Sequence, residues 1–210
     1  MVSRGLHTFR RGGILSQAMP GMKTHCTALV LIPPLEVWEP IQTIRRRYDR
    51  QFKRWMPHVT LLYPFRPMDG FEDIRPALEE RCARVSPFEV TLATLSYFEH
   101  TREKFTMWLA PEPADPVVAL QSALLECAPD CNDVNLHAGG FRPHLSLGQA
   151  RSAAELEDRM NRIRAVWQPM RFVVREIALI RRGPDRADPF QVDRLIPFGV
   201  RASGKRAGNR

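Results

Sequence analysis

The sequence has 210 residues but no long apolar run, only four cysteines and no acidic residue near its start. A membrane-spanning helix needs about 20 consecutive apolar residues, whereas the longest candidate, "CTALVLIPP" at residues 26–34, ends in two prolines. Residues 1–35 also lack a compact apolar stretch followed by a small-residue cleavage site, which argues against a secretory signal. We therefore expect a globular protein that has no transmembrane segment and does not act at a membrane.

The scarcity of cysteine points to a reducing compartment. Cys26, Cys82 and Cys127 fall within apolar segments, which predicts packed, reduced thiols and a cytoplasmic protein. Cys127 and Cys131, with His137 nearby, form the best candidate for a zinc site. Their spacing is loose and a fourth ligand is missing, so we expect no metal and no other cofactor.

The positive charge of the chain suits a polyanionic partner such as RNA. Its formal value is +8 and the pI is near 9.9, and cationic surfaces attract phosphates at long range. Part of this charge lies in residues 1–22, which we expect to be a basic leader, either disordered or upstream of a true start near Met19 or Met22. An organelle-targeting signal is the alternative. Residues 201–210 form a basic tail, and residues 23–200 form one domain, which we expect to be monomeric.

Apolar periodicity predicts alternating strands and helices in the first half of the chain. Short apolar, β-branched runs bounded by proline or polar turns indicate strands, and apolar residues three or four apart indicate helices. On this basis we expect strands at residues 25–34, 57–65, 87–99 and 104–111, and helices at residues 35–52, 71–85 and 115–128. The polar turn "HTREK" joins the last two strands into an antiparallel hairpin.

The same order returns in the second half, which makes the chain a degenerate internal repeat. Here we expect strands at residues 143–150, 170–182 and 190–200, and a helix at residues 152–167. Phe88 lies 30 residues after His58, and Phe172 lies 28 residues after His144. The repeat predicts an α+β fold with two pseudo-symmetric lobes that divide near residues 111–116, in which antiparallel sheets line a central cleft and the helices lie outside.

Two short motifs stand at corresponding places in this repeat. "PHVTLLYPF" begins at residue 57 and "FRPHLSLGQ" at residue 141, and both contain Pro-His-apolar-Thr/Ser-Leu. Side chains alternate between the two faces of a strand, so His58 and Thr60 share one face, as do His144 and Ser146. The opposite face, packed on the helices, is expected to hold Val59, Leu61, Tyr63, Leu145 and Leu147.

Two imidazoles and two hydroxyls that face one cleft are suited to phosphate chemistry. Histidine, with an unperturbed pKa of about 6.5, can take or give a proton near neutral pH. His58 and His144 can therefore divide the base and acid roles on opposite sides of a phosphorus atom. The hydroxyls of Thr60 and Ser146 can donate hydrogen bonds to the non-bridging oxygens of the bound substrate. Arg142, two residues before His144, is a further candidate phosphate contact, and the alternative is a solvated arginine at a strand start.

The pattern His-x-Thr/Ser is short enough to occur by chance, and it occurs a third time at residues 25–27. Proline precedes and leucine follows each of the two main motifs, whereas His25 has neither neighbour. We interpret His25 as a structural histidine that opens the first strand. We expect His100, in a turn, and His137, in a loop, to be solvated.

The segments "PHVTLLYPF" and "FRPHLSLGQ" resemble the paired His-x-Thr/Ser motifs of the 2H phosphoesterase superfamily. This superfamily includes the 2′-5′ RNA ligase-like proteins and the 2′,3′-cyclic nucleotide phosphodiesterases, and the likeness covers residues 24–200. It implies a bilobal fold and metal-free action on 2′,3′-cyclic or 2′-5′-linked phosphates, with catalytic roles for the two motif histidines and their hydroxyl partners. Bacterial members of the RNA-ligase-like branch tend to have an arginine shortly after the second motif, where this chain has Gly148 and Gln149.

We therefore expect a metal-independent phosphodiesterase that opens 2′,3′-cyclic phosphates at the ends of RNA or nucleotides and gives a 2′-phosphate. Cleavage or ligation of 2′-5′ linkages in the same cleft is a second hypothesis. An RNA-binding module that keeps the pocket without turnover is a third. Base preference depends on loops at the edge of the cleft, where the sequence offers no readable code.

Overall fold

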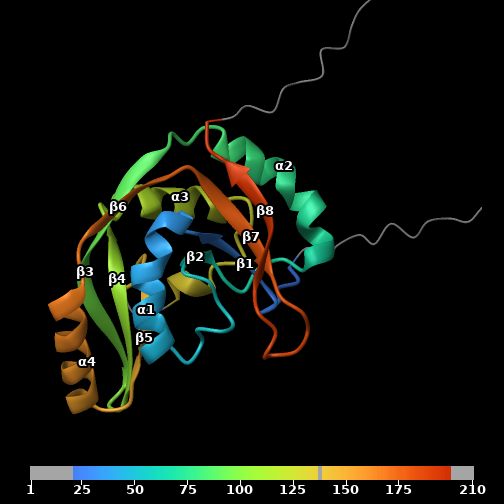
Figure 1. Cartoon of the computed structure of the whole chain (residues 1–210). Helices are drawn as coiled ribbons and strands as arrows, with labels where there is room; N and C mark the ends of the chain where they lie inside the picture. The colour runs from blue at the N-terminus through green and yellow to red at the C-terminus, as the bar shows by residue number, and fades with distance from the viewer. Residues whose placement is uncertain (1–20, 137–138, 200–210) are drawn as a thin grey trace, which may run out of the picture.

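The computed structural model describes residues 21–136 and 139–199 (Figure 1). Residues 1–20 of the expected leader and the whole expected tail, residues 201–210, lie outside the described residues. In chain order the elements are β1 Thr27–Leu31, α1 Trp38–Tyr48, β2 Val59–Leu62, α2 Phe71–Cys82, β3 Phe88–Thr101, β4 Lys104–Glu112, α3 Asp115–Leu125, β5 Leu145–Ala150, α4 Ala153–Val166, β6 Met170–Val174, β7 Glu176–Arg181 and β8 Gln191–Pro197. Among these residues no helix is long and apolar enough to span a bilayer.

The strands form one curled antiparallel sheet in the order β6-β3-β4-β5-β2-β1-β7-β8. The two motif strands, β2 and β5, lie at its centre, each with three strands beyond it. Val59 of β2 pairs with Leu145 of β5, and this pairing joins the two halves. The α+β fold with a pseudo-symmetric antiparallel sheet is therefore confirmed.

The helices cover the outer face of the sheet, and α1 and α3 each pack on the motif strand of the other half of the chain. Helix α1, which precedes β2 in the chain, packs on β5, and α3, which precedes β5, packs on β2. The main apolar core lies between these helices and the sheet and takes Leu29, Val59, Leu61, Leu145 and Leu147. Burial of this face fixes which residues of each motif strand lie on the opposite, inner face. A shift of the strand pairing by one residue would expose the whole apolar set.

Residues 170–182, expected to be one strand, form two. β6 pairs with β3 in one half of the sheet, whereas β7 pairs with β1 and β8 in the other half. Between them Arg175 leaves the ladder, and its carbonyl accepts a hydrogen bond from the Phe198 amide at 2.7 Å. The prediction was wrong because apolar alternation continues through the run, while the change of pairing partner depends on the curl of the sheet.

The helix expected at residues 35–52 ends early, at Tyr48 of α1. Asp49 follows in an extended conformation, and its Oδ1 accepts a hydrogen bond from the Gln51 amide at 2.8 Å. Such a side-chain turn competes with the helical hydrogen bonds and ends the helix. The freed segment, residues 49–57, then leads to the first motif.

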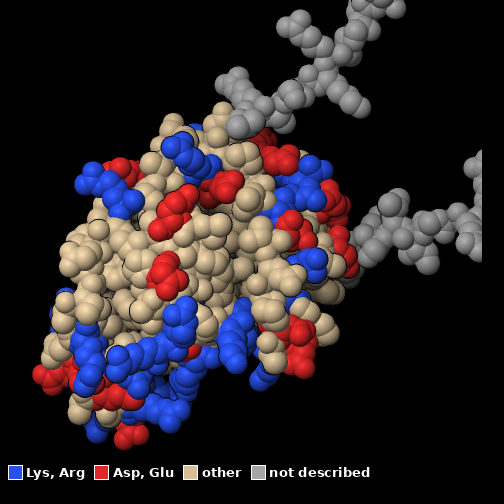
Figure 2. Space-filling model, in the orientation of Figure 1, with Lys and Arg blue, Asp and Glu red and all other residues tan. Residues whose placement is uncertain are grey.

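Lysine and arginine side chains are spread unevenly over the surface. Figure 2 shows many of them gathered on the lower part of the molecule, over the end of α1 and the neighbouring end of α4, with several acidic side chains among them. This part of the surface lies close to the centre of the sheet because α1 packs on β5.

Gly148 is needed where α1 crosses β5. A bulge leaves Leu147 without a partner, since Met107 pairs with Gly148 and Trp108 with Ser146. A Cβ at Gly148 would lie 2.6 Å from both the Cβ and the carbonyl oxygen of Tyr48. We expect Gly148→Ala to lower the free energy of unfolding by about 1–3 kcal/mol through overpacking, measured by urea denaturation. An unchanged midpoint would contradict this contact between α1 and β5.

Candidate active site

The four motif side chains lie together on the inner face of the sheet. Val59 and Leu145 are paired and buried, at 3% and 0% exposed, so the residues on either side of them point away from the core. Because the strands are antiparallel, continuing this pairing by one residue sets His58 across from Ser146 and Thr60 across from His144. Cross-strand neighbours have Cα atoms about 4.5–5.5 Å apart. Each histidine thus faces the hydroxyl of the other motif.

Both histidines are held in the same way by the backbone. The Nδ1 of His58 lies 2.7 Å from the carbonyl oxygen of Met56, and the Nδ1 of His144 lies 2.8 Å from that of Arg142. A carbonyl oxygen can only accept, so in each ring Nδ1 carries a proton and donates it. In the neutral form the lone pair that accepts a proton is then on Nε2. The two rings are therefore set in equivalent tautomers.

His58 is in an environment that favours its neutral form. Trp55 stacks on the ring with centroids 4.7 Å apart and an interplanar angle of 19°. Burial is the main cause that lowers the pKa of His58 to about 4, and the positive charges of Arg45 and His144 lower it further. The Met56 carbonyl and Asp49 act in the opposite direction. At neutral pH His58 is therefore a base with an available lone pair.

His144 lies against a second aromatic group. Phe98 contacts its ring edge-on at a centroid distance of 4.9 Å, and Trp108 does so at 6.0 Å. Trp108 pairs with Ser146 across the sheet and is only 5% exposed. Its Nε1 is buried and has no hydrogen-bond partner among the residues that the structure describes. A buried N–H group without a hydrogen-bond partner costs free energy. The indole N–H of Trp108 is thus an unsatisfied donor beside His144.

Arg142, the candidate phosphate contact, lies at this edge of the site. Its side chain is exposed, and its guanidinium sits 5.8 Å from the centroid of the Phe98 ring. Its carbonyl oxygen holds His144. The structure therefore brings Arg142 together with His144, while its contact with phosphate stays a prediction.

Comparison with known proteins identifies the family. The model of the 2′-5′ RNA ligase superfamily matches residues 33–186, which is most of the chain. The chain belongs to the 2′-5′ RNA ligase superfamily. The match confirms the resemblance seen in the two motifs.

Relatives of this superfamily share sequence and fold with the chain. A Staphylococcus aureus (strain Newman) protein named "Putative phosphoesterase" is 28% identical over 163 residues, 75% of this chain and 90% of that protein. The E. coli LigT structure complexed with 3′-AMP has a TM-score of 0.54 at 17% identity and covers 84% of this chain and 99% of LigT. The protein TT0787 of Thermus thermophilus has a TM-score of 0.53 at 21% identity and covers 83% of this chain and 98% of TT0787. At these identities the two structures support the fold alone.

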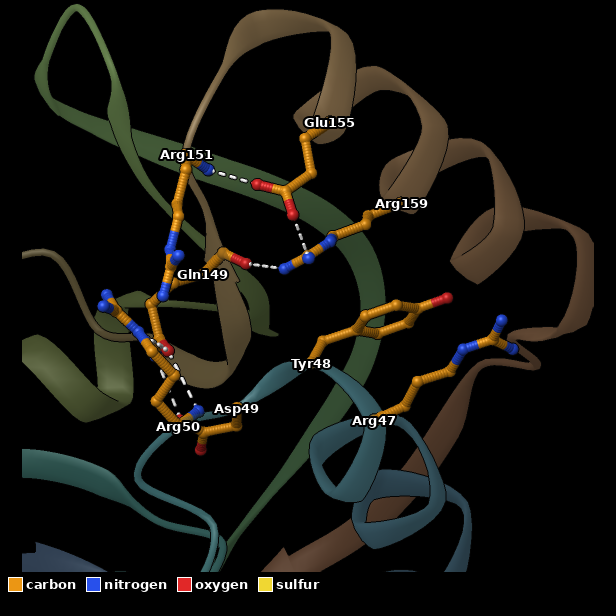
Figure 3. A pocket seen from close by; sticks show the side chains of 8 residues that line it. All are labelled: Arg47, Tyr48, Asp49, Arg50, Gln149, Arg151, Glu155 and Arg159. Atoms are coloured by element: carbon orange, nitrogen blue, oxygen red, sulfur yellow. Dashed lines mark hydrogen bonds and ion pairs between the residues drawn. The ribbon is translucent and has the colours of Figure 1, made fainter.

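In this member of the 2′-5′ RNA ligase superfamily a pocket of about 330 Å³ lies beside the motif strands, at the end of α1. Its lining comes from three segments that are far apart in the sequence: the end of α1, the end of β5 and the first turns of α4 (Figure 3). The residues that line it are Arg47, Tyr48, Asp49, Arg50, Gln149, Arg151, Glu155 and Arg159. Sequence reasoning missed this pocket because no single segment shows it.

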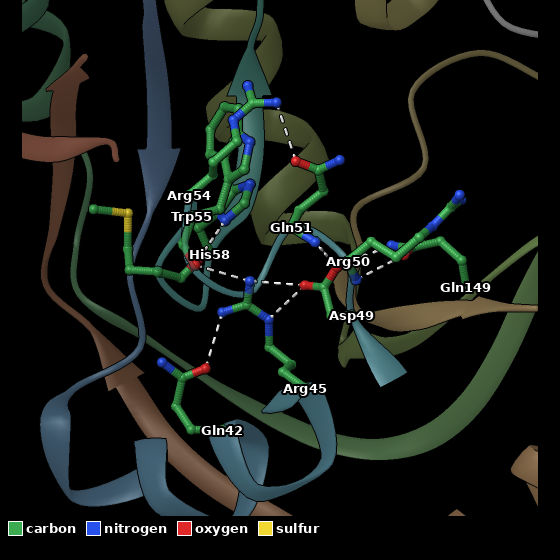
Figure 4. Close-up of polar contacts among 10 residues, drawn as sticks. Gln42, Arg45, Asp49, Arg50, Gln51, Arg54, Trp55, His58 and Gln149 are labelled. Atoms are coloured by element: carbon green, nitrogen blue, oxygen red, sulfur yellow. Dashed lines mark hydrogen bonds and ion pairs between the residues drawn. The ribbon is translucent and has the colours of Figure 1, made fainter. Parts of the chain in front are cut away.

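A buried ion pair supports the segment that carries Trp55 and His58 (Figure 4). Arg45 and Asp49, both 2% exposed at the side chain, are 2.8 Å apart, and the same Arg45 nitrogen donates to the Trp55 carbonyl at 2.8 Å. Gln149 of β5 donates to Asp49 Oδ1 at 3.0 Å. The network ties α1, β5 and the first motif together. It was missed because "RRRYDR" is typical of a solvated helix face, and only tertiary contacts bury Arg45.

Tyr63 was expected on the core face, and this was wrong. β2 ends at Leu62, which is buried in the main core like Leu61, so the alternation breaks there. Tyr63 instead contacts Trp55 edge-on at 5.5 Å, on the side of His58. Trp55 in turn stacks on Phe190 at a centroid distance of 3.7 Å. An aromatic group therefore flanks His58, as another flanks His144.

His25 and His100 lie outside the two His-x-Thr/Ser motifs. His25 is exposed, two residues before β1, with its ring edge-on to Tyr63 at 5.2 Å. His100 is exposed as expected, but it belongs to β3, and its Nε2 lies 2.9 Å from the Thr106 hydroxyl. β3 runs on to Thr101, so the polar turn is shorter than expected. His137 lies outside the described residues.

The cysteines are free thiols, as expected from their apolar surroundings. Burial raises the pKa of Cys82 to about 12 and that of Cys131 to about 11. Across residues 21–136 and 139–199, no group of three or more His, Cys, Asp or Glu side chains is arranged to hold a metal ion. His137, the third member of the candidate zinc site with Cys127 and Cys131, lies outside the described residues.

Proposed function

We propose that the chain is a metal-independent phosphodiesterase that opens 2′,3′-cyclic phosphates at the ends of RNA or nucleotides and gives a 2′-phosphate. The observation that carries this proposal is the central pairing of Val59 with Leu145, which sets each motif histidine across from the hydroxyl of the other motif. Membership of the 2′-5′ RNA ligase superfamily and the phosphoesterase relatives support phosphate ester chemistry.

The environment of His58 supports its role as the base, and the acid role then falls to His144. His58, neutral at pH 7, takes a proton from a water molecule through Nε2, and the water oxygen attacks the phosphorus. The bond from phosphorus to the 3′ oxygen breaks, and protonated His144 gives its proton to that oxygen. Thr60 and Ser146 donate hydrogen bonds to the non-bridging oxygens, where negative charge builds up. The product is a 2′-phosphate with a free 3′ hydroxyl.

Aromatic groups on both sides of the histidines support a nucleotide substrate. Trp55 and Phe190 stack on one side, and Phe98 and Trp108 stack on the other with centroids 4.8 Å apart. Nucleobases stack on such side chains with little dependence on sequence. The related LigT was solved with 3′-AMP and with ATP, which is consistent with ligands of this kind.

A substrate panel tests the proposal. The purified protein is incubated with 2′,3′-cyclic mononucleotides, an RNA with a 2′,3′-cyclic phosphate end and 2′-5′-linked dinucleotides, and the products are separated by chromatography. We expect turnover of the cyclic phosphates. Turnover of the 2′-5′ dinucleotides alone would replace the proposal by 2′-5′ cleavage, and binding without turnover of any of the three would indicate an RNA-binding module.

The pH dependence of kcat/KM should report the low pKa of His58. As the base, His58 must be neutral, so activity is lost as the pH falls through its pKa of about 4. We expect kcat/KM for a cyclic mononucleotide to follow a bell-shaped pH profile whose acid limb bends near pH 4 and falls by about tenfold per pH unit below it. The apparent value belongs to the coupled pair of histidines. An acid limb near the ordinary value of about 6.5 would contradict the assignment of His58 as a desolvated base.

A further inference from the structure

The pocket at the end of α1 is rich in arginine that has no carboxylate partner. Four arginines and two carboxylates line it. Arg159 is paired with Glu155, but none of the other three arginines forms an ion pair within the part of the chain that the structure describes. Those three are Arg47, Arg50 and Arg151, and all are exposed. Unpaired guanidinium groups that line one hollow favour an anionic ligand.

Both carboxylates of the pocket are already engaged inside the protein. Asp49 accepts hydrogen bonds from Arg45, Gln149 and the Gln51 amide. Glu155 accepts from Arg159 and from the Arg151 amide. The positive charge of the pocket is therefore not cancelled from within, and the two acids act to position the surrounding side chains.

Two of the arginines are held against one aromatic ring, and a third is held by Gln149. The guanidinium groups of Arg47 and Arg159 lie 5.4 Å and 5.3 Å from the centroid of Tyr48. Arg50 is held through its backbone amide, which donates to Gln149 Oε1 at 3.1 Å, and its Nε lies 3.4 Å from the same oxygen. Figure 3 shows Tyr48 between Arg159 and Arg47, and Arg50 and Arg151 together beside Gln149. Ordering side chains before a ligand arrives reduces the entropy lost on binding.

Gln149, which lines the pocket, lies on the same face of the sheet as the two histidines. Ser146 pairs with Trp108, and Gln149 pairs with Thr106, two residues before Trp108 on β4. Residues two apart on a strand share a face, so Gln149 and Ser146 lie on one side. Three residues along β5 correspond to about 10 Å. A ligand bound at the histidines can therefore extend along β5 to reach Gln149 and the Arg50 side chain, whose Nε lies 3.4 Å from Gln149 Oε1.

We propose that this arginine pocket is a second phosphate site, which binds a phosphate of the substrate other than the one between His58 and His144. The inference rests on the proposed function for the identity of the first phosphate. Two kinds of substrate carry such a second group: an oligoribonucleotide, through a phosphate of its backbone, and a mononucleotide with an additional terminal phosphate. In both, the pocket gives preference to substrates that extend beyond the cyclic phosphate.

Binding of defined ligands to charge-neutralising variants tests the site. Arg151→Gln and Arg47→Gln each remove one charge from the pocket, and Arg164→Gln removes one from the exposed surface of the same helix, α4, outside the pocket. The probes are a ribotrinucleotide ending in a 2′-phosphate, the corresponding mononucleotide, and that mononucleotide with an added 5′-phosphate, measured by calorimetry. The 2′-phosphate end is the product of the proposed reaction, so it binds without being consumed.

We expect Arg151→Gln and Arg47→Gln to weaken trinucleotide binding by about 10-fold each and to leave mononucleotide binding within about twofold. The slope of log affinity against log salt should fall by about 0.7 for each lost phosphate contact, and Arg164→Gln should change neither value. If only the 5′-phosphorylated mononucleotide discriminates, the second phosphate is a terminal one.

Equal effects of the pocket variants and the control would overturn the second phosphate site. So would equal losses for the short and the extended ligand. The proposed function is tested separately, by turnover of a 2′,3′-cyclic mononucleotide on the same wild-type preparation. Absence of that turnover with the binding differences intact would remove the catalytic proposal and leave the pocket as a phosphate site.

Discussion

We expect replacement of His58 or His144 with alanine to lower kcat/KM for a 2′,3′-cyclic phosphate substrate by about 10²- to 10⁴-fold, the usual contribution of one general acid or base. Both side chains are partly exposed, and the polar contact described above for each is to a carbonyl two residues earlier in the chain. The fold should therefore survive, which circular dichroism and thermal melting check. His100→Ala is a matched control, because His100 is exposed on the same sheet outside the motifs.

The double variant provides a further criterion. Groups that act as one acid–base unit show losses that do not multiply, so His58→Ala combined with His144→Ala should be close to the worse single variant. Turnover like that of the wild type by either folded single variant would remove the histidine from the mechanism. A loss of the same size in His100→Ala would show that the sheet, and not the motif, is being disturbed.

Arg45→Met lowers the free energy of unfolding by about 3–5 kcal/mol, because breaking a buried ion pair leaves its partner charge without compensation. Arg45 holds Asp49 at 2.8 Å and the Trp55 carbonyl at 2.8 Å, so its loss also frees the segment that leads to His58. Urea denaturation measures the first effect, and kcat/KM measures the second. Arg46→Met is the control, since Arg46 is the next residue of α1 and is 58% exposed at its side chain.

Lysine at position 45 should not restore the wild-type behaviour. The guanidinium reaches Asp49 through two nitrogens and Gln42 through the third, whereas an ammonium is a single point of contact. Equal stabilities for Arg45→Met and Arg46→Met would show that the buried pair does not hold α1 to the motif segment.

The central site could be predicted from the sequence because it depends on local rules. The period of two along a strand puts His58 with Thr60 and His144 with Ser146 on the inner face, and the apolar residues between them are buried, as the pattern indicates. The repeat predicted that both motif strands face one cleft, and the structure pairs them at the centre of a single eight-stranded sheet. The contacts of these side chains with substrate stay predictions.

Features that depend on which segments meet in space could not be read from the sequence. Arg45 and Asp49 are four residues apart, a spacing that is common on solvated helix faces, and only the Trp55 carbonyl and β5 bury them. The arginine pocket combines three segments, and the change of partner between β6 and β7 follows from the curl of the sheet. The ion pair, the pocket and the change of strand partner all leave the local pattern of apolar residues unchanged, so that pattern could not predict them.

The most direct test of the two-histidine account is the product formed from a 2′,3′-cyclic mononucleotide in ¹⁸O-labelled water, followed by ³¹P NMR. The wild-type protein and the His58→Gln/His144→Gln double variant, both exhaustively treated with chelator, are compared in this one measurement. The account predicts a 2′-phosphate with one ¹⁸O atom from the wild type, and formation of this product by the folded double variant at a rate lower by about 10²- to 10⁴-fold. Equal product from the two proteins, or a wild-type protein that leaves the cyclic phosphate intact, would contradict it.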